Sequence, residues 1–226
     1  PLPKSSLTRF SRHLLLPSFT IANQQILSSS KVLVVGAGGL GSPLLQYLAA
    51  MGVGTVGVVD GDEVDLSNLQ RQVVHSEGTV GVNKAESARR RMLEINSEVQ
   101  VVTYEEEMTA DNAMDIAKDK NWDIIVDGSD NFPTKYLLSD LSEMLGVPFV
   151  YGGVLGFTGQ VSVFNDPPGI GPAYRDYLPV PPNPEDIPSC AEGGVLGAVP
   201  GVVGMVQCVE VVKSLVNARV DRGGEG

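Results

Sequence analysis

The sequence predicts an α/β fold built on a doubly wound, mainly parallel sheet with an antiparallel extension. Short apolar runs rich in β-branched residues alternate with segments whose apolar residues recur at helical spacing, and a glycine-rich loop directly follows the first run. Continuous apolar runs are typical of strands buried on both faces of a parallel sheet. Strands that alternate with helices place the ligand at the carboxyl ends of the strands. Together these features are typical of a Rossmann-like fold.

The expected elements follow one another without an internal repeat. Residues 1–30 are interpreted as an N-terminal arm and a helix. The expected strands are Lys31–Val35, Thr55–Val59, Val99–Thr103, Asp123–Asp127, Pro148–Tyr151 and Gln160–Phe164, the last of them antiparallel. A helix is expected after the glycine loop, where Leu44, Leu45, Leu48 and Met51 recur at helical spacing. Further helices are expected over Asn83–Ile95, Ala110–Lys118 and Tyr136–Leu145.

The composition changes after the last expected strand. Residues 165–189 are rich in proline and poor in apolar side chains, which predicts a flexible crossover loop rather than a regular element. Residues 195–216 then predict an apolar helix, which Pro200, Gly201 and Gly204 are expected to break. The last residues are expected to fray. A chain of 226 residues supports one sizeable core, so residues 1–226 are interpreted as a single domain.

Charge and composition exclude several classes of protein. The formal net charge of −11 argues against a general nucleic-acid binder, which needs a basic surface. Only two cysteines occur, Cys190 and Cys208, too few for a disulfide scaffold or a four-cysteine zinc site. No uninterrupted apolar run reaches the ~18 residues of a membrane span, and the polar start lacks a signal-peptide centre. We therefore expect no membrane association and a cytoplasmic location.

The glycine loop predicts a bound nucleotide. The spacing of Gly36, Gly38 and Gly41 between a strand and a helix permits a tight turn and close approach of the backbone to a phosphate. Asp60, at the end of the next strand, is placed to accept hydrogen bonds from a ribose. The alternative is a glycine-rich turn that serves packing alone.

The loop by itself does not separate ATP from NAD. A dehydrogenase would need a general acid in a substrate site. The two histidines, His13 and His75, lie before or beside the nucleotide unit, so no separate substrate domain supplies that acid. This argues against a dehydrogenase.

The polar segment that follows Asp60 gives a more specific indication. It is one of six ordered motifs, which are Arg9-Phe10-Ser11-Arg12, the glycine loop, Ser67-Asn68-Leu69-Gln70-Arg71, Lys84, Gly128-Ser129-Asp130-Asn131 and Cys190-Ala191-Glu192-Gly193-Gly194-Val195. In these motifs the sequence resembles the ubiquitin-activating-type (ThiF/MoeB-like) adenylyltransferases, above all the molybdopterin-synthase and ubiquitin-related-modifier activating enzymes. The resemblance covers nearly the whole chain.

The resemblance implies ATP-dependent adenylation of the C-terminal Gly-Gly of a ubiquitin-like sulfur-carrier protein. Attack of a carboxylate on the α-phosphate joins two anions, so the site must neutralise charge. Arg71 and Lys84 would do so, with Asn68 as a neutral donor. Arg9 or Arg12 would join them, and Arg12 matches the family arginine that reaches across a twofold homodimer.

The remaining roles also follow from the resemblance. Asp130 would hold the Mg²⁺ that bridges the phosphates. Gly39 would let the backbone approach the nucleotide. The residues expected to bind ATP are Gly38, Gly39, Asp60, Asp62, Ser67, Asn68, Leu69, Gln70, Arg71, Lys84, Asp130 and Asn131. The catalytic set is Arg12, Arg71, Lys84, Asp130 and Cys190.

Each of these residues has a simpler interpretation. An arginine after a helix start is often a surface cation. Lys84 could flank a solvated helix face with Arg89 and Arg90. Asp130, next to Asn131, could cap the following helix.

Cys190 lies between the proline-rich loop and an expected helix start at Gly194-Val195, where a helix N-terminus can lower a thiol pKa. By resemblance it matches the position at which eukaryotic members form a transient thioester or acyl-persulfide with the carrier, whereas bacterial relatives stop at the acyl-adenylate. The alternative is an unreactive loop cysteine. Cys208, on the apolar helix, is expected to be a core residue.

Two departures from the family bear on metal and partners. The family carries a Cys-x-x-Cys pair where this chain has Ala173 and Asp176, so no zinc site is expected. The C-terminal strands that help to receive the carrier, and any rhodanese domain, are expected to be absent.

The expected partners are the carrier, a second copy of the chain and a sulfur donor, either a rhodanese or a cysteine desulfurase. The expected pathway is tRNA thiolation, molybdopterin synthesis or both. Two alternatives remain. One is a non-catalytic partner of a heterodimeric activating enzyme, and the other is a relative that adenylates a tRNA base.

Overall fold

The computed structural model describes residues 2–183 and 194–220. Its centre is a six-stranded sheet in the order β3-β2-β1-β4-β5-β6. The strands are β1 (Lys31–Val35), β2 (Thr55–Val59), β3 (Gln100–Tyr104), β4 (Ile124–Asp127), β5 (Phe149–Leu155) and β6 (Thr158–Phe164). All neighbouring strands are parallel except the β5–β6 hairpin. The predicted mainly parallel sheet with an antiparallel extension is confirmed.

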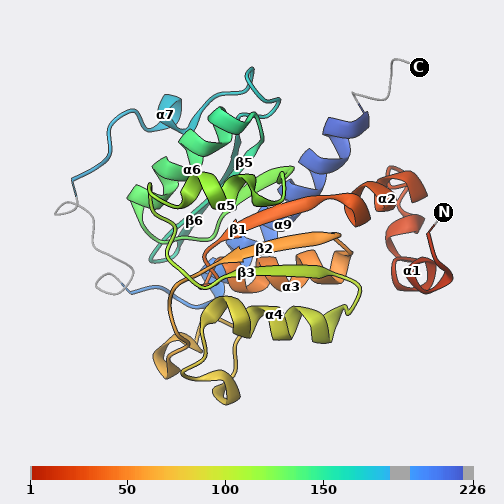
Figure 1. The fold of residues 1–226 in the computed structure, drawn as a ribbon, viewed down its shortest axis with the longest axis horizontal. Coiled ribbons are helices and arrows are strands. Elements are labelled where there is room, and N and C mark those ends of the chain that lie inside the picture. The colour runs from red at the N-terminus through yellow and green to blue at the C-terminus, as the bar shows by residue number, and fades with distance from the viewer. Residues whose placement is uncertain (1, 184–193, 221–226) are drawn as a thin grey trace.

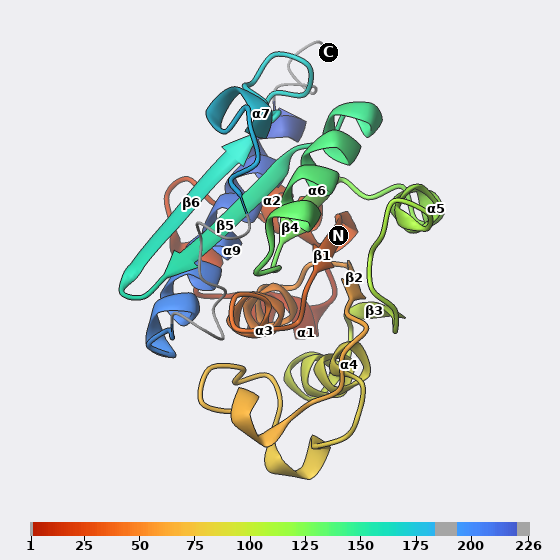
Figure 2. The same cartoon turned by 90° about the vertical axis from the view of Figure 1, so that its left-hand side faces the viewer.

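Helices cover both faces of this sheet (Figures 1 and 2). They are α1 (Lys4–Arg9), α2 (Ile21–Ser29), α3 (Gly41–Met51), α4 (Lys84–Ile95), α5 (Ala113–Asp119), α6 (Phe132–Leu145), α7 (Tyr174–Tyr177) and α9 (Ala198–Val220), with the short 3-10 turns η1 (His13–Leu15), η2 (Leu66–Asn68) and η3 (Glu77–Thr79). In the view of Figure 1, α5 and α6 lie above β1, and α3 and α4 lie below it.

The continuous apolar runs serve two cores at once. In β1, Val32 and Val34 pack with α3, α4 and α9, whereas Leu33 and Val35 pack with α5 and α6. Successive side chains of a strand point to opposite faces, so a strand buried on both faces has no polar position to alternate with. This is the physical reason why the apolar residues of β1 form an unbroken run of Val and Leu.

Helix α9 differs from its prediction in two respects. It begins at Ala198 rather than at Gly194-Val195, and it is unbroken. Pro200 is tolerated because it lies in the first turn, where its missing N–H has no partner in the helix. A side chain at Gly204 would overlap the carbonyl oxygen of Leu40, so this glycine allows α9 to lie against the glycine loop.

Helix α9 also has the length and apolar composition of a membrane span over Ala198–Asn217. The core helix of a globular fold meets the same criterion, and Cys208, Val211 and Leu215 of α9 are buried against the sheet. The expectation for Cys208 as a core residue is confirmed.

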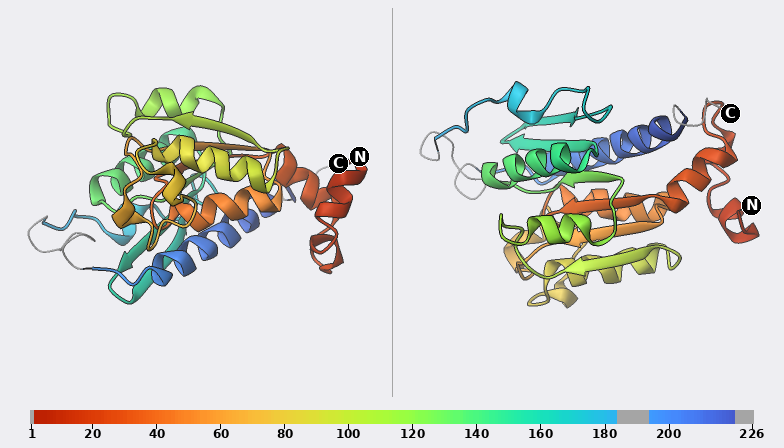
Figure 3. Two further views of the ribbon diagram at one scale, coloured as in Figure 1. Left: turned by 90° about the horizontal axis from the view of Figure 1, so that it is seen from below. Right: turned by 45° about the horizontal axis from the view of Figure 1, so that its top comes forward.

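Two further segments are more ordered than predicted. The N-terminal arm contains α1, η1 and α2, and Phe10 covers Gly52 at the end of α3. Figures 1 and 3 place these elements at the end of the sheet where β1 begins. The proline-rich crossover contains α7, which is held by the buried Tyr174 and by the Arg175–Asp140 ion pair at 2.7 Å.

Candidate active site

A cavity of about 410 Å³ lies at the carboxyl ends of β1, β2 and β4. The strand order reverses between β1 and β4, and this switch point is where doubly wound sheets bind ligands. The lining residues come from the glycine loop, the segment after β2, the start of α4, the loop after β3 and the β4–α6 loop. They include Gly38, Gly39, Asp60, Asp62, Arg71, Gln72, Lys84, Met108, Ser129, Asp130 and Asn131.

The glycines of the loop have two different tasks. Gly36 has φ +100°, and a Cβ there would lie 2.5 Å from the carbonyl oxygen of Gly128. A Cβ at Gly41 would overlap the carbonyl oxygen of Gly36. At Gly38 the nearest atom would be Nε2 of Gln72, at 3.7 Å. Gly36 and Gly41 therefore serve packing, whereas Gly38 opens onto the cavity at the start of α3.

This division predicts opposite outcomes for two glycine substitutions. Gly41→Ala should lower the free energy of unfolding by about 3 kcal/mol, because the methyl group overlaps backbone atoms that cannot move aside. Gly38→Ala should leave the unfolding midpoint close to that of the wild type and weaken nucleotide binding, because its methyl group occupies the cavity. Urea unfolding and nucleotide titration of both variants test this, and equal destabilisation would contradict it.

Asp60 braces the loop as well as lining the cavity. Its Oδ2 accepts a hydrogen bond from the backbone N–H of Ala37 at 2.8 Å, and its Oδ1 accepts one from the N–H of Asp62 at 3.0 Å. Burial raises the pKa of Asp60, and these two bonds together with Lys84 oppose that rise. Each carboxylate oxygen retains a second lone pair, so the predicted contact with a ribose stays open.

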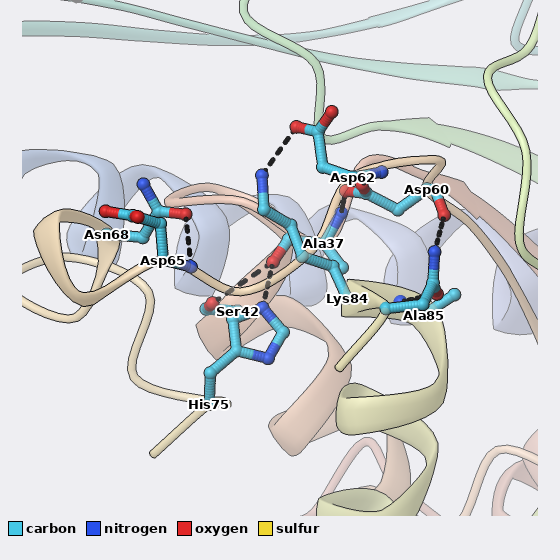
Figure 4. A network of polar contacts seen from close by, with 10 residues as sticks. Ala37, Ser42, Asp60, Asp62, Asp65, Asn68, His75, Lys84 and Ala85 are labelled. Carbon is cyan, nitrogen blue, oxygen red and sulfur yellow. Dashed lines mark hydrogen bonds and ion pairs between the residues drawn. The ribbon is translucent and has the colours of Figure 1, made fainter. Parts of the chain in front are cut away.

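Lys84 is held by an acidic neighbour rather than by solvent. Its Nζ lies 2.6 Å from Oδ2 of Asp62, as Figure 4 shows, and its side chain is only 9% exposed. Arg89 and Arg90, by contrast, pair with Glu86 farther along α4. The interpretation of Lys84 as one of a row of solvated cations is therefore wrong, because its ammonium group lines the cavity.

Only some of the ATP-binding residues predicted around η2 line the cavity. Arg71 lines the cavity, and its Nη1 donates to the carbonyl oxygen of Ser67 at 3.3 Å. Asn68 instead accepts a hydrogen bond from the N–H of Asp65 through Oδ1. The four predicted residues that do not line the cavity are Ser67, Asn68, Leu69 and Gln70.

Asp130 and its neighbour Asn131 have separate roles. Asn131 is the N-cap of α6, since its Oδ1 accepts the N–H of Thr134 at 2.9 Å. The interpretation of Asp130 as the helix cap is therefore wrong. Its carboxylate lines the cavity and has no hydrogen-bond or ion-pair partner within residues 2–183 and 194–220.

Sequence reasoning missed several residues of the cavity. Gln72 is 4% exposed, and its Oε1 is buried without a hydrogen-bond partner among the described residues. It follows Arg71 directly, so the same polar segment could have indicated it. Met108 and Val154 come from the loop after β3 and from the β5–β6 hairpin, where the sequence carries no motif.

His75 supports the glycine loop from behind. Its Nε2 lies 3.0 Å from the carbonyl oxygen of Ala37 (Figure 4). Its Nδ1 lies 2.9 Å from Oγ of Ser87. The neutral ring satisfies both contacts when Nε2 donates to the carbonyl and Nδ1 accepts from the hydroxyl. Burial lowers the pKa of His75 to about 4.

The lowered pKa of His75 predicts a loss of stability on mild acidification. The unfolded chain takes up a proton as the pH falls through 6.5, whereas the folded chain does so only near pH 4. The contribution of His75 to the free energy of unfolding is therefore complete above pH 6.5 and declines as the pH falls below that value. Between pH 7 and pH 5 the free energy of unfolding should fall more steeply for the wild type than for His75→Gln in urea titrations. Equal slopes would rule this out.

Arg12, a member of the predicted catalytic set, does not line the cavity of its own chain. Arg12 is exposed and lies beside η1, at the end of the sheet where β1 begins. Its neighbour Arg9 donates to the carbonyl oxygen of Ile95 at 3.0 Å. Cys190 lies outside the described residues.

The positions of the missing cysteine pair form a hydrogen-bonded turn. The backbone N–H of Ala173 donates to Oδ2 of Asp176 at 2.8 Å, which starts α7. Among the described residues, no group of three or more His, Cys, Asp or Glu side chains is arranged to hold a metal ion. The absence of zinc stays a prediction.

A Rossmann-like sheet with a glycine loop, two cationic side chains and the Asp130 carboxylate around one cavity defines a nucleotide-binding protein. The sequence model of the ThiF family matches residues 10–223, and the chain belongs to this family. The chain is 48% identical over 212 residues to adenylyltransferase and sulfurtransferase MOCS3-1 of Zea mays, with 94% of this chain and 44% of that protein covered.

Two other comparisons agree with this assignment. The chain is 46% identical to the sulfur carrier protein adenylyltransferase of Thermus thermophilus, with 94% of this chain and 79% of that protein covered. It is 48% identical to a probable adenylyltransferase/sulfurtransferase MoeZ of Mycobacterium tuberculosis, covering 94% of this chain and 54% of that protein. The chain therefore spans about half the length of several curated relatives that it matches.

Solved structures support the fold. The structure of E. coli MccB with ATP superimposes with a TM-score of 0.75 at 24% sequence identity, covering 92% of this chain and 64% of that one. The structure of PaaA superimposes with a TM-score of 0.78 at 22% sequence identity, covering 96% of this chain and 67% of that one.

Proposed function

We propose that this chain adenylates the C-terminal Gly-Gly carboxylate of a ubiquitin-like sulfur-carrier protein with ATP. The observation that carries the proposal is the convergence of Arg71, Lys84 and Asp130 on one cavity beside the open Gly38. These residues come from three separate segments, and packing alone does not require them at one place. The relative named sulfur carrier protein adenylyltransferase supports the choice of substrate.

In the proposed reaction a carboxylate oxygen of the carrier attacks the α-phosphorus of ATP. The bond from this phosphorus to the bridging oxygen breaks, and pyrophosphate leaves. Arg71 and Lys84 offset the negative charge that spreads during the in-line displacement. Lys84 has three N–H donors and Asp62 takes one of them, so two remain for phosphate oxygens.

The residues around the cavity fit a magnesium ion that accompanies ATP. The carboxylate of Asp130, which has no partner in the described part of the chain, would supply an oxygen ligand, and Mg²⁺ is usually held by one or two carboxylates together with substrate phosphates. When bound, the ion would neutralise phosphate charge and favour departure of pyrophosphate. Asp60 would hold the ribose and Gly38 and Gly39 would let the backbone approach the nucleotide.

The proposal includes a homodimer, because Arg12 is remote from the cavity of its own chain. A second copy would supply Arg12 to this cavity. A guanidinium group suits that task, since it is always charged and binds phosphate oxygens two at a time.

We also propose that Cys190 takes up the activated carrier. Its sulfur would attack the acyl carbon of the adenylate, and AMP would leave to give a thioester. A sulfur donor would then act on the carrier for tRNA thiolation, molybdopterin synthesis or both. We place the reaction in the cytoplasm, where thiols stay reduced.

Exchange of labelled pyrophosphate into ATP tests the proposal, because it needs the carrier and reports the first step alone. The wild type should exchange label only when a Gly-Gly-ended carrier is present. Cys190→Ala should spare this exchange and abolish the covalent carrier adduct detected by mass spectrometry. ATP binding without exchange for any such carrier would overturn the function.

A further inference from the structure

A fully buried ion pair lies directly beneath the loop that carries Asp130. Nζ of Lys135, on α6, lies 2.6 Å from Oδ2 of Asp127, at the end of β4. The side chain of Lys135 is 6% exposed and that of Asp127 is 0% exposed. Neither residue lines the cavity.

The pair holds Ser129 at three points. Oδ1 of Asp127 accepts the backbone N–H of Ser129 at 3.0 Å and its hydroxyl at 2.6 Å. Nζ of Lys135 donates to the carbonyl oxygen of Ser129 at 3.0 Å and to that of Gly152 at 2.8 Å. Every polar group of Ser129 is thus bound, and all three N–H donors of Lys135 are used.

Asp130 therefore projects from a loop that is fixed on both sides. Ser129 is held by the ion pair, and Asn131 is held by its cap bond to Thr134. Asp130 itself has no partner in the described part of the chain. A carboxylate without contacts of its own takes its direction from the backbone that carries it.

The cost of burying this ion pair indicates that it positions the loop rather than stabilises the fold. Burial of two charges costs several kcal/mol of solvation, and an apolar pair of similar volume is often as stable. The bonds to Ser129 are what an apolar pair could not provide. They transmit the geometry of the rigid sheet to the cavity.

We propose that Lys135 and Asp127 are positioning residues that aim the Asp130 carboxylate at the metal–nucleotide complex. The inference rests on the proposed function, since it presumes that Asp130 binds the metal. Partners that orient a metal ligand typically change metal affinity by about 10–100-fold when they are replaced. A residue that only stabilises the fold would not change how binding depends on the metal.

The test measures ATP affinity by calorimetry with Mg²⁺ and with EDTA, and takes the ratio of the two affinities. Single replacement of Lys135 would leave a buried unpaired charge, so the variant is the double substitution Asp127→Asn with Lys135→Met. The asparagine keeps an acceptor for Ser129. The ratio should fall about tenfold, while the affinity in EDTA stays close to that of the wild type.

Two further variants complete the design. Ser129→Ala removes one bond to the ion pair and should lower the ratio by a smaller factor, about fivefold. Ser129→Ala replaces the double variant in the test if the double variant does not fold. Tyr136→Phe is the matched control on α6, because its hydroxyl donates to the carbonyl oxygen of Leu178, away from the loop. It should keep the wild-type ratio.

The outcomes separate this inference from the function on which it rests. Asp130→Ala serves as the reference for complete loss of the Mg²⁺ effect. If Asp130→Ala loses the effect and the variants of the ion pair keep it, the positioning role alone is overturned. If Asp130→Ala also keeps the Mg²⁺ effect on ATP affinity, both the metal-binding role of Asp130 and the positioning role are overturned. If the wild type binds no ATP, the proposed function itself fails.

Discussion

Asp130→Ala is expected to lower carrier-dependent pyrophosphate exchange by about a thousandfold, the usual scale for removing a group that stabilises transition-state charge. The Asp130 carboxylate lines the cavity and forms no bond within residues 2–183 and 194–220, so its removal leaves no buried donor unsatisfied. The variant should therefore unfold at the wild-type temperature. A loss of exchange at full stability would assign the effect to the reaction rather than to the fold.

A second carboxylate of the cavity provides the control for Asp130. Glu107 also lines the cavity, from the loop that follows β3, and it is exposed. Glu107→Ala removes the same charge and should keep exchange close to the wild-type level. Equal losses in the two variants would show that only the total negative charge matters. Wild-type exchange by Asp130→Ala would remove this residue from the mechanism.

The sequence was informative wherever one segment determines its own surroundings. The run Val32–Val35 predicted a strand buried on both faces, and the two cores receive its side chains alternately. Asp60 and Asp130 follow strand ends, and the carboxyl ends of parallel strands meet at one edge, so their approach to one cavity could be predicted.

The features of the fold and of the site that could not be predicted depend on contacts between distant segments. Gly204 was expected to break α9, but it allows the helix to approach Leu40 without disturbing its hydrogen bonds. Met108 and Val154 reach the cavity only because the loop after β3 and the β5–β6 hairpin meet there. The contact between His75 and the carbonyl oxygen of Ala37 joins residues 38 positions apart. None of these contacts leaves a periodic or motif signal in the sequence.

An equal mixture of Arg12→Ala and Asp130→Ala is expected to regain exchange activity that neither variant has alone. Loss of an arginine that stabilises phosphoryl transfer costs about a thousandfold or more, so Arg12→Ala alone should be nearly inactive. In a mixed dimer, the cavity of the Arg12→Ala chain keeps its own Asp130 and receives Arg12 from the other chain. Half of the pairs are mixed and one of their two cavities is complete, so about a quarter of wild-type exchange should return.

A mixture of Arg71→Ala and Asp130→Ala is the matched control. Arg71 and Asp130 line the same cavity of one chain, so every cavity in that mixture lacks one of them. No activity should return, although the dimers mix in the same way. Recovery in both mixtures would point to residual activity of the variants. Absence of recovery in both, with mixed dimers present, would overturn the supply of Arg12 by the second copy. Wild-type exchange by Arg12→Ala alone would place Arg12 outside the reaction, because its distance from the cavity of its own chain leaves the second copy as the only route to the phosphates.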